Sequence, residues 1–175
     1  MDNSGVAVCL MPDKLSRFRR FYGTEYKNAR MQIIQPSSFH EFEQYYRLRY
    51  EMLRKPWHQP LGSERVDDDD QAIHLMAIHS DSGEIMGGCR VHLESDTEAQ
   101  LRFLAVGPKY QNKQVGRRLL QAVEEEARKM GAKDLIVQAR EYAKNFYKRN
   151  GFTEEYPTHL LFGEVQHYQM RKPLY

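Results

Sequence analysis

The sequence predicts an α/β (α+β) protein with a central mixed, mostly antiparallel sheet of six or seven strands and helices on both faces. Three apolar runs joined by short polar turns, at residues 72–79, 85–94 and 99–107, are typical of an antiparallel meander. The order then becomes strand, helix, strand, helix up to Gly151. Because such a crossover requires a parallel strand pair, we expect that pair at the middle of a mixed sheet.

The remaining elements flank this centre. A strand closed by Pro36 comes first, and Ser37 or Ser38 then caps a helix, with Glu41 completing a capping box. A helix of about four turns follows Val106 and ends at Gly131. The segments that come after it are predicted in this order: a strand at 134–139, a short helix at 140–150, and strands at 152–157 and 160–174.

The composition is that of an ordinary globular domain. The chain has 175 residues, 41% of them hydrophobic and 29% charged, which is enough to bury a sizeable core. No apolar run approaches the roughly 18 residues of a membrane span, and no signal-peptide core opens the chain. We therefore expect a cytoplasmic protein without membrane contact. The net charge of +2 is too weak to indicate nucleic acid.

Two further expectations concern the N-terminal region and the cysteines. We expect a basic appendage at residues 1–29 and one domain at residues 30–175. Cys9 and Cys89 have neither a metal-ligand spacing nor a Cys-x-x-Cys pattern. Cys89 lies in an apolar strand, so we expect a reduced thiol in the core.

A polar, basic loop stands where the helix after Val106 begins. A helix N-terminus presents unpaired N–H groups and the positive end of the macrodipole, which together attract phosphate. Gly116 lets the backbone approach a ligand closely. Lys113, Arg117 and Arg118 are each unfavourable there by about a few tenths of a kcal/mol unless an anion offsets them. The loop indicates a phosphate ligand, with an ordinary strand-to-helix turn as the alternative.

Aromatic residues gather in the segment from 139 to 152. Phe146 and Phe152 are expected in the core. A phenol such as Tyr147, placed beside the loop, can donate a proton to a leaving group. The alternative for Tyr147 is a packed surface aromatic.

These two segments together resemble the GNAT acetyltransferase superfamily. The loop motif, Gln/Arg-x-x-Gly-x-Gly/Ala at the start of a helix, corresponds to Gln111–Gly116, and Ala-x-x-Phe-Tyr-x-x-x-Gly-Phe corresponds to Ala143–Phe152. The strand at 101–106 also matches, and the resemblance covers residues 31–173. Two positions depart from the pattern: Gln114 replaces the first motif glycine, and Arg140 stands where many members have Asn.

The resemblance implies a GNAT fold, splayed at its parallel pair, that uses acetyl-CoA without a metal. The pyrophosphate would meet the N–H groups of residues 112–117, and the pantetheine arm would lie along residues 104–106. Tyr147 would protonate the departing thiolate, and a backbone N–H near Val106 would polarise the acyl carbonyl. The implied cofactor-binding residues are Leu104, Ala105, Val106, Gln111, Asn112, Lys113, Gln114, Val115, Gly116, Arg117, Arg140, Asn145 and Tyr147.

The base that removes a proton from the amine is less well defined. Glu94, His92 and His74 are candidates on strands facing the thioester, but strand parity is not fixed by the sequence. We take His74 and Tyr147 as the catalytic expectations, with a packed core histidine as the alternative for His74. His167, on the last strand, is placed near the acceptor by the resemblance alone.

The segment from 49 to 70 is the most individual part of the chain. It resembles the acetyltransferase-like half of bacterial proteins fused to a hot-dog thioesterase. Its polar and aromatic residues either contact substrate or fix the shape of the loop: Arg54, Trp57, His58 and Arg65. The four aspartates at 67–70 are expected in a solvated loop with an N-cap, because four adjacent carboxylates cannot all reach one ion.

We therefore expect an N-acetyltransferase that acts on a primary amine of a small molecule or a protein. Two alternatives stay open: a GNAT-like decarboxylase of malonyl-CoA or of a malonyl acyl carrier protein, and a non-catalytic CoA-binding module. An acidic acyl carrier protein would suit the basic patch at residues 109–118. A homodimer is also left open.

Overall fold

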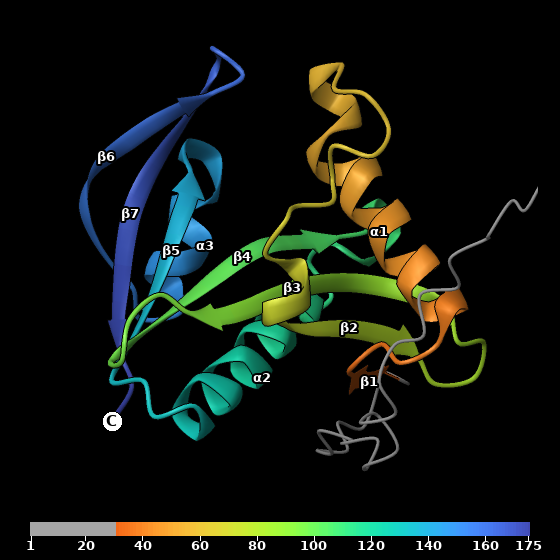
Figure 1. Cartoon of the computed structure of the whole chain (residues 1–175), viewed down its shortest axis with the longest axis horizontal. Helices are drawn as coiled ribbons and strands as arrows, with labels where there is room; N and C mark the ends of the chain where they lie inside the picture. The colour runs from red at the N-terminus through yellow and green to blue at the C-terminus, as the bar shows by residue number, and fades with distance from the viewer. Residues whose placement is uncertain (1–30) are drawn as a thin grey trace, which may run out of the picture.

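The computed structural model describes residues 31–175, which form a single seven-stranded mixed sheet with helices on both faces (Figure 1). The strand order is β1-β2-β3-β4-β5-β7-β6, and β4 and β5 form the parallel pair at the middle. The predicted fold class is confirmed. The basic appendage predicted at 1–29 and Cys9 lie outside the described residues.

The elements follow the predicted order along the chain. Short 3-10 turns lie at Lys55–Trp57, Asp69–Gln71, Pro108–Tyr110 and Glu141–Ala143. The strands and helices are β1 (Met31–Ile34), α1 (Phe39–Leu53), β2 (Ile73–His79), β3 (Ile85–Leu93), β4 (Glu98–Val106), α2 (Val115–Lys129), β5 (Asp134–Arg140), α3 (Lys144–Arg149), β6 (Thr153–Leu161) and β7 (Val165–Pro173). No helix among the described residues is long and apolar enough to cross a membrane.

Helix α1 covers one face of the sheet. Ser38 caps it: the Glu41 N–H donates to Ser38 Oγ at 3.2 Å, and the Ser38 N–H donates to Glu41 Oε2 at 3.0 Å. This is the predicted capping box, which satisfies two N–H groups at once. Tyr45 and Tyr46 form the buried side of α1. A Cβ on Gly88 of β3 would lie 2.9 Å from the Tyr45 ring, so the missing side chain lets α1 sit close to the sheet.

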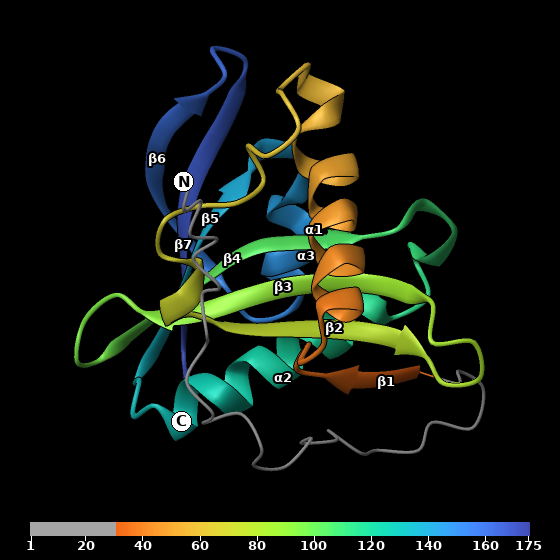
Figure 2. The same cartoon turned by 45° about the vertical axis from the view of Figure 1, so that its right-hand side comes forward.

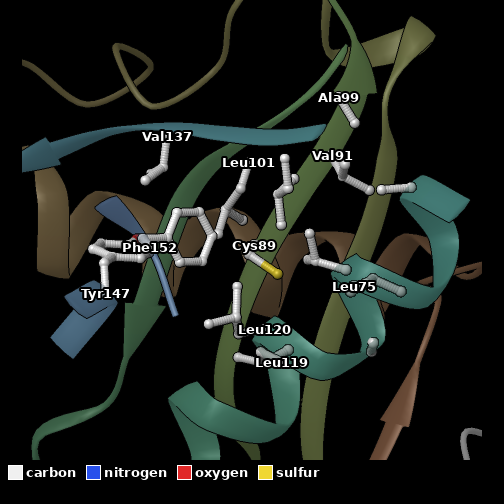
Figure 3. Packing of buried hydrophobic residues seen from close by; sticks show 14 of the residues in the cluster. Leu75, Cys89, Val91, Ala99, Leu101, Leu119, Leu120, Val137, Tyr147 and Phe152 are labelled. Carbon is white, nitrogen blue, oxygen red and sulfur yellow. The ribbon is translucent and has the colours of Figure 1, made fainter. Parts of the chain in front are cut away.

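Helices α2 and α3 cover the opposite face, where the main core lies (Figures 1 and 2). Figure 3 shows the leucines of α2 packed against side chains of β2, β3 and β4, with Tyr147 of α3 and Phe152, which directly precedes β6, beside them. Cys89 is fully buried there as a free thiol, as expected. The central members of this core are Leu75, Cys89, Val91, Leu101, Leu119, Leu120, Val123, Val137, Tyr147 and Phe152.

The parallel pair opens after a few residues. β4 and β5 are paired only from Glu98↔Asp134 to Leu101↔Val137. On its other side β4 contains one extra residue, because Gly88 faces Ala105 while Arg90 faces Arg102. Cys89 is therefore opposite both Phe103 and Leu104, and Phe103 takes φ 57°. A bulge bends the strand that carries it, and beyond it β5, β6 and β7 turn away from β2–β4 (Figure 1).

We predict that Gln114→Gly stabilises the protein. Gln114 begins α2 with φ 65° and ψ 0°, a left-handed conformation that costs a non-glycine residue about 1–2 kcal/mol. Glycine adopts it freely but loses more chain entropy on folding. We therefore expect the free energy of unfolding in urea to rise by about 0.5–1 kcal/mol. Gln111→Gly is the matched control, because Gln111 has φ −64° and should lose stability. Equal losses in the two variants would contradict the prediction.

Candidate active site at the divergence of β4 and β5

The loop before α2 has the features of an anion site. Residues 111–114 are exposed, and Asn112 and Gln114 both have positive φ. The first turn of α2 contains no acidic residue, and no side chain caps its N–H groups. Lys113 and Arg117 are exposed beside it. Because uncapped N–H groups and the helix dipole both favour a negative charge, a phosphate fits these residues better than any side chain present.

Gly116 has a packing role at the same helix end. A Cβ on Gly116 would lie 3.4 Å from Phe146 Cζ and 3.6 Å from Val106 Cγ2. The missing side chain thus lets α3 and the end of β4 close against the start of α2. Glycine at this position also lets a ligand approach the backbone, as predicted from the sequence, so the contact with Phe146 and Val106 is a second reason for it.

The end of β4 leads into the loop. Leu104 and Val106 are partly buried against the main core, and Ala105 is buried. Gln111 Nε2 donates to the Val106 carbonyl at 3.3 Å, which ties the loop to the strand. Since β4 and β5 are no longer paired here, the side of β4 that faces β5 is an unpaired strand edge.

Tyr147 comes from α3 and packs in the main core, against which Leu104 and Val106 of β4 also pack. Its side chain is buried, with ring centroids 5.1 Å from Phe146 and 5.4 Å from Phe152 (Figure 3). Burial raises the pKa of Tyr147 above its usual value, although the Arg140 charge partly opposes this. The phenol is therefore protonated at neutral pH and can only donate its proton. Asn145 is exposed on the same short helix.

Arg140 spans the opening instead of pointing to the loop. It ends β5, and its Nη2 donates to the Leu53 carbonyl at the end of α1 at 3.2 Å. Its Nη1 donates to the Tyr142 hydroxyl at 2.9 Å, and its guanidinium lies 5.8 Å from the Trp57 ring. These contacts place Arg140 on the α1 face. The resemblance implied a cofactor-binding role for Arg140, and in the structure its guanidinium contacts the end of α1 and the Trp57 ring instead of the loop before α2.

His74 lies on β2, and its side chain is covered by α1. Its Nε2 lies 2.7 Å from the Asp69 carbonyl, so Nε2 carries the proton and Nδ1 is buried without a partner among the described residues. The rings of Phe42, Tyr45 and Tyr46 contact it edge-on. β3 separates it from β4. These surroundings are those of a packed histidine, and we give His74 no part in the chemistry.

The other candidate bases lie in different places. His92 and Glu94 contact each other at 3.3 Å, at the end of β3 that faces the start of β4, away from the opening. His167 is opposite Arg140 in the β5–β7 register and therefore lies on the same face. Its Nδ1 lies 2.8 Å from the Val165 carbonyl, so Nδ1 carries the proton and Nε2 keeps the lone pair.

A group of arginines lies beside the opening, and of its members only Arg54 was singled out from the sequence. We call it the arginine layer. It consists of Arg49, Arg54, Arg90 and Arg102, whose guanidinium carbons lie 3.4, 5.5, 5.2 and 4.8 Å from the centre of the Phe103 ring. One feature of the sequence could have indicated this group. Arg49 lies at a position of the helix spacing that is otherwise apolar, and a charged residue on a buried face needs a partner.

The loop at 54–72 holds this layer in place. Asp69 is buried and binds Arg49 and Arg90, and Asp68 binds Arg90. The expectation that residues 67–70 form a solvated loop was wrong for Asp69, which is buried between two arginines, whereas Asp68 stays partly exposed and begins the 3-10 turn as its N-cap. Arg65 contacts Glu43 at 3.2 Å, so its contacts fix the shape of the loop. No group of three or more potential metal ligands occurs within residues 31–175.

Comparisons with known proteins agree with this geometry. Residues 39–152 match the acetyltransferase (GNAT) family. A putative N-acetyltransferase from Lactobacillus plantarum is 22% identical, with a TM-score of 0.73 over 85% of this chain and 100% of that chain. An aminoglycoside 6'-N-acetyltransferase complexed with coenzyme A is 16% identical, with a TM-score of 0.68 over 82% of this chain and 97% of that chain.

Escherichia coli ElaA is also 16% identical, with a TM-score of 0.67 over 81% of this chain and 97% of that chain. At these identities the structures establish a shared fold and nothing finer. The family match carries more, because it extends from the start of α1 to Phe152 and includes both the loop before α2 and the α3 segment. The chain belongs to the GNAT acetyltransferase family.

Proposed function

We propose that the protein transfers an acetyl group from acetyl-CoA to a primary amine. One observation carries the proposal: β4 and β5 part beside an uncapped helix N-terminus, and the protonated phenol of Tyr147 belongs to the core cluster against which Leu104 and Val106 pack. Three parts of a CoA thioester therefore each have a matching group in the protein. The phosphates have the helix N-terminus, the extended arm has the unpaired edge of β4, and the leaving sulfur has the Tyr147 phenol. The CoA complex of the similar aminoglycoside acetyltransferase supports the choice of donor.

The residues present suit CoA along its length. The N–H groups of residues 112–117 hold the pyrophosphate, and Lys113 and Arg117 add positive charge. The unpaired edge of β4 at Leu104–Val106 offers main-chain hydrogen bonds to the pantetheine amides, as a sheet edge does to an added strand. Asn145, exposed on α3, is proposed as a further contact of the cofactor.

The chemistry is a direct transfer. The amine nitrogen attacks the thioester carbonyl carbon, so a C–N bond forms and the C–S bond breaks. Tyr147 gives its proton to the departing sulfur. His167 Nε2, with its lone pair on the α1 face, accepts the proton that the amine loses. Most of the rate enhancement comes from holding the amine and the thioester together.

The acceptor is an amine on a small molecule or a protein. We also propose that an acyl carrier protein can carry the donor, that the protein forms a homodimer and that it is cytoplasmic. The relation of residues 49–70 to proteins fused to a hot-dog thioesterase also stays a prediction. The two alternatives differ from the transferase in their requirements. A decarboxylase needs no amine, and a non-catalytic binder needs neither an amine nor the Tyr147 proton. The experiments below separate them.

Acetyl-CoA and free CoA should both stabilise the protein. A ligand at about 100 times its Kd adds roughly 2.7 kcal/mol to the free energy of unfolding. We expect a higher melting temperature with either compound at millimolar concentration. In Arg117→Glu the shift should shrink, although the helix should not weaken, because an acidic first-turn residue suits the dipole. An unchanged melting temperature of the wild-type protein with both compounds would count against the proposed function.

Tyr147→Phe should slow transfer without weakening CoA binding. The variant keeps the buried ring and loses only the proton donor, so kcat should fall by about 10²–10⁴-fold while the CoA-induced melting shift stays. Thiol release with an accepted amine is the measurement, and Phe146→Tyr is a control that leaves the Tyr147 phenol in place. A binder without catalysis would show no acyl transfer in the wild-type protein.

His167→Asn should remove the acidic limb of the pH–rate profile. Burial holds the pKa of His167 below its usual value, the Val165 carbonyl opposes this, and His159 and Arg140 lower it further. The base form therefore predominates above that pKa, so the wild-type rate should rise to a plateau before neutral pH. Asn keeps a donor for the Val165 carbonyl but has no base. A variant with an unchanged profile would exclude His167 as the base.

A further inference from the structure

The arginine layer carries more positive charge than its carboxylate partners neutralise. Asp69 binds both Arg49 and Arg90, at 3.0 and 2.8 Å. Asp68 binds Arg90 at 2.7 Å and lies 3.5 Å from Arg102. These two carboxylates thus serve three guanidinium groups. Buried charges that lack full pairing are costly, and a surplus of one sign in such a place calls for a partner.

Arg54 adds a fourth positive charge without a carboxylate. It is buried, and its Nε and Nη1 donate only to the carbonyls of Ser63 and Leu53. The nearby Glu64 accepts from the Gly62 N–H and pairs with Arg65. No carboxylate within residues 31–175 lies at ion-pair distance from Arg54. The layer therefore holds four cations against two carboxylates.

Several N–H groups of the layer are buried and unused. Arg49 Nε and Nη2 and Arg90 Nε have no hydrogen-bond partner among the described residues, although these side chains are only 2% and 0% exposed. A donor left unpaired on a buried charged group costs more than one on a neutral group. A binding partner that supplies acceptor oxygens would offset that cost.

The protonation of the layer reflects the same surplus. Burial lowers the pKa of Arg54, and the neighbouring charges of Arg49, Arg140 and Arg102 lower it further, while Glu64 opposes them. Burial and Arg90 likewise lower the pKa of Arg102. Guanidinium groups keep their charge under such shifts at neutral pH. The electrostatic potential at this point is therefore positive.

The layer lies beside the reacting centre. Phe103, which all four guanidinium groups surround, is the bulge residue directly before Leu104. Arg140 reaches across the opening to Leu53, and Arg54 lies 5.5 Å from the Phe162 ring in the β6–β7 turn. Arg102 and Phe103 are partly exposed, so the layer has an edge open to solvent.

We propose that the arginine layer binds a carboxylate of the substrate. The inference rests on the proposed function and narrows its substrate class. The carboxylate belongs either to the amine acceptor, as in an amino acid, or to the acyl chain of the thioester, as in a succinyl or malonyl group. Guanidinium groups bind carboxylates through two parallel hydrogen bonds, which also fixes orientation. A polycationic amine is repelled from the same place.

Arg102→Gln is the variant that tests the proposal with least damage to the fold. The Arg102 side chain is 38% exposed and has one distant carboxylate partner, whereas Arg49 and Arg90 are buried. Arg65→Gln is the matched control, since it removes the same charge from an exposed arginine outside the layer, which pairs with Glu43 and Glu64. Both variants should keep the melting shift produced by acetyl-CoA.

The first measurement is binding of a simple probe. Succinate should raise the melting temperature of the wild-type protein more than sodium chloride of equal ionic strength, and succinamide should not. The effect should persist with saturating CoA, which fills the anion site at α2, and should weaken about tenfold in Arg102→Gln but not in Arg65→Gln. An effect of succinate no larger than that of salt, or one lost only in Arg117→Glu, would overturn the proposal.

The second measurement separates the two sources of the carboxylate. Amino acids are compared with their carboxamides as acceptors, and acetyl-CoA with succinyl-CoA and malonyl-CoA as donors. A preference in kcat/KM for the charged acceptor or for the charged donor, reduced in Arg102→Gln, supports the proposal and names the source. Equal kcat/KM values for the charged and neutral forms, or a higher value for spermidine, would contradict the proposal. Failure of acetyl-CoA itself to bind would instead reject the proposed function.

Discussion

The extra residue in β4 decides where this protein can have a site. Because Cys89 is opposite both Phe103 and Leu104, β4 bends after Leu101 and leaves the parallel pairing with β5. An unpaired strand edge in the middle of a sheet leaves main-chain groups without partners, which is costly unless a ligand or water supplies them. The bulge also puts Phe103 at φ 57°, with its ring turned to the α1 face. The bulge thus creates the unpaired edge of β4 and also places the Phe103 ring where the guanidinium groups of the arginine layer contact it.

The two faces of the sheet at the bulge have opposite chemistry. The α2 face is apolar, and a Cβ on Gly87 would meet the Ala105 carbonyl at 2.9 Å and Leu119 at 3.0 Å. The α1 face holds the charged groups, and there Gly88 gives room to Tyr45. Two adjacent glycines in β3 therefore let a helix approach closely from each side. A larger residue at either position would push a helix away from the point where β4 bends.

The protonation states at the opening are matched to a transfer reaction. Burial keeps Tyr147 protonated, and burial together with neighbouring positive charges keeps His167 neutral. Under the proposed function, the donor for the leaving group and the acceptor for the amine proton would come from opposite sides of the splayed strands. Arg140 influences both groups and links β5 to the end of α1. The proposed substrate carboxylate would lie on the same positively charged side.

The sequence by itself determined the element order, a capping box of Glu41 with Ser37 or Ser38, the parallel crossover and the two motif segments, because these depend on local periodicity, caps and turns. It did not determine which side chains meet. His74 and His167 look alike as strand histidines, yet one is enclosed by aromatic rings and the other shares a face with Arg140. A single bulge changes which side chains of a strand face each side of the sheet, and no local pattern in residues 101–106 predicts it. The same long-range contacts turn Asp68 and Asp69 from expected loop residues into partners of Arg90. Only the tertiary structure decided this, because a buried charge is stable only where residues distant in sequence bring it a partner.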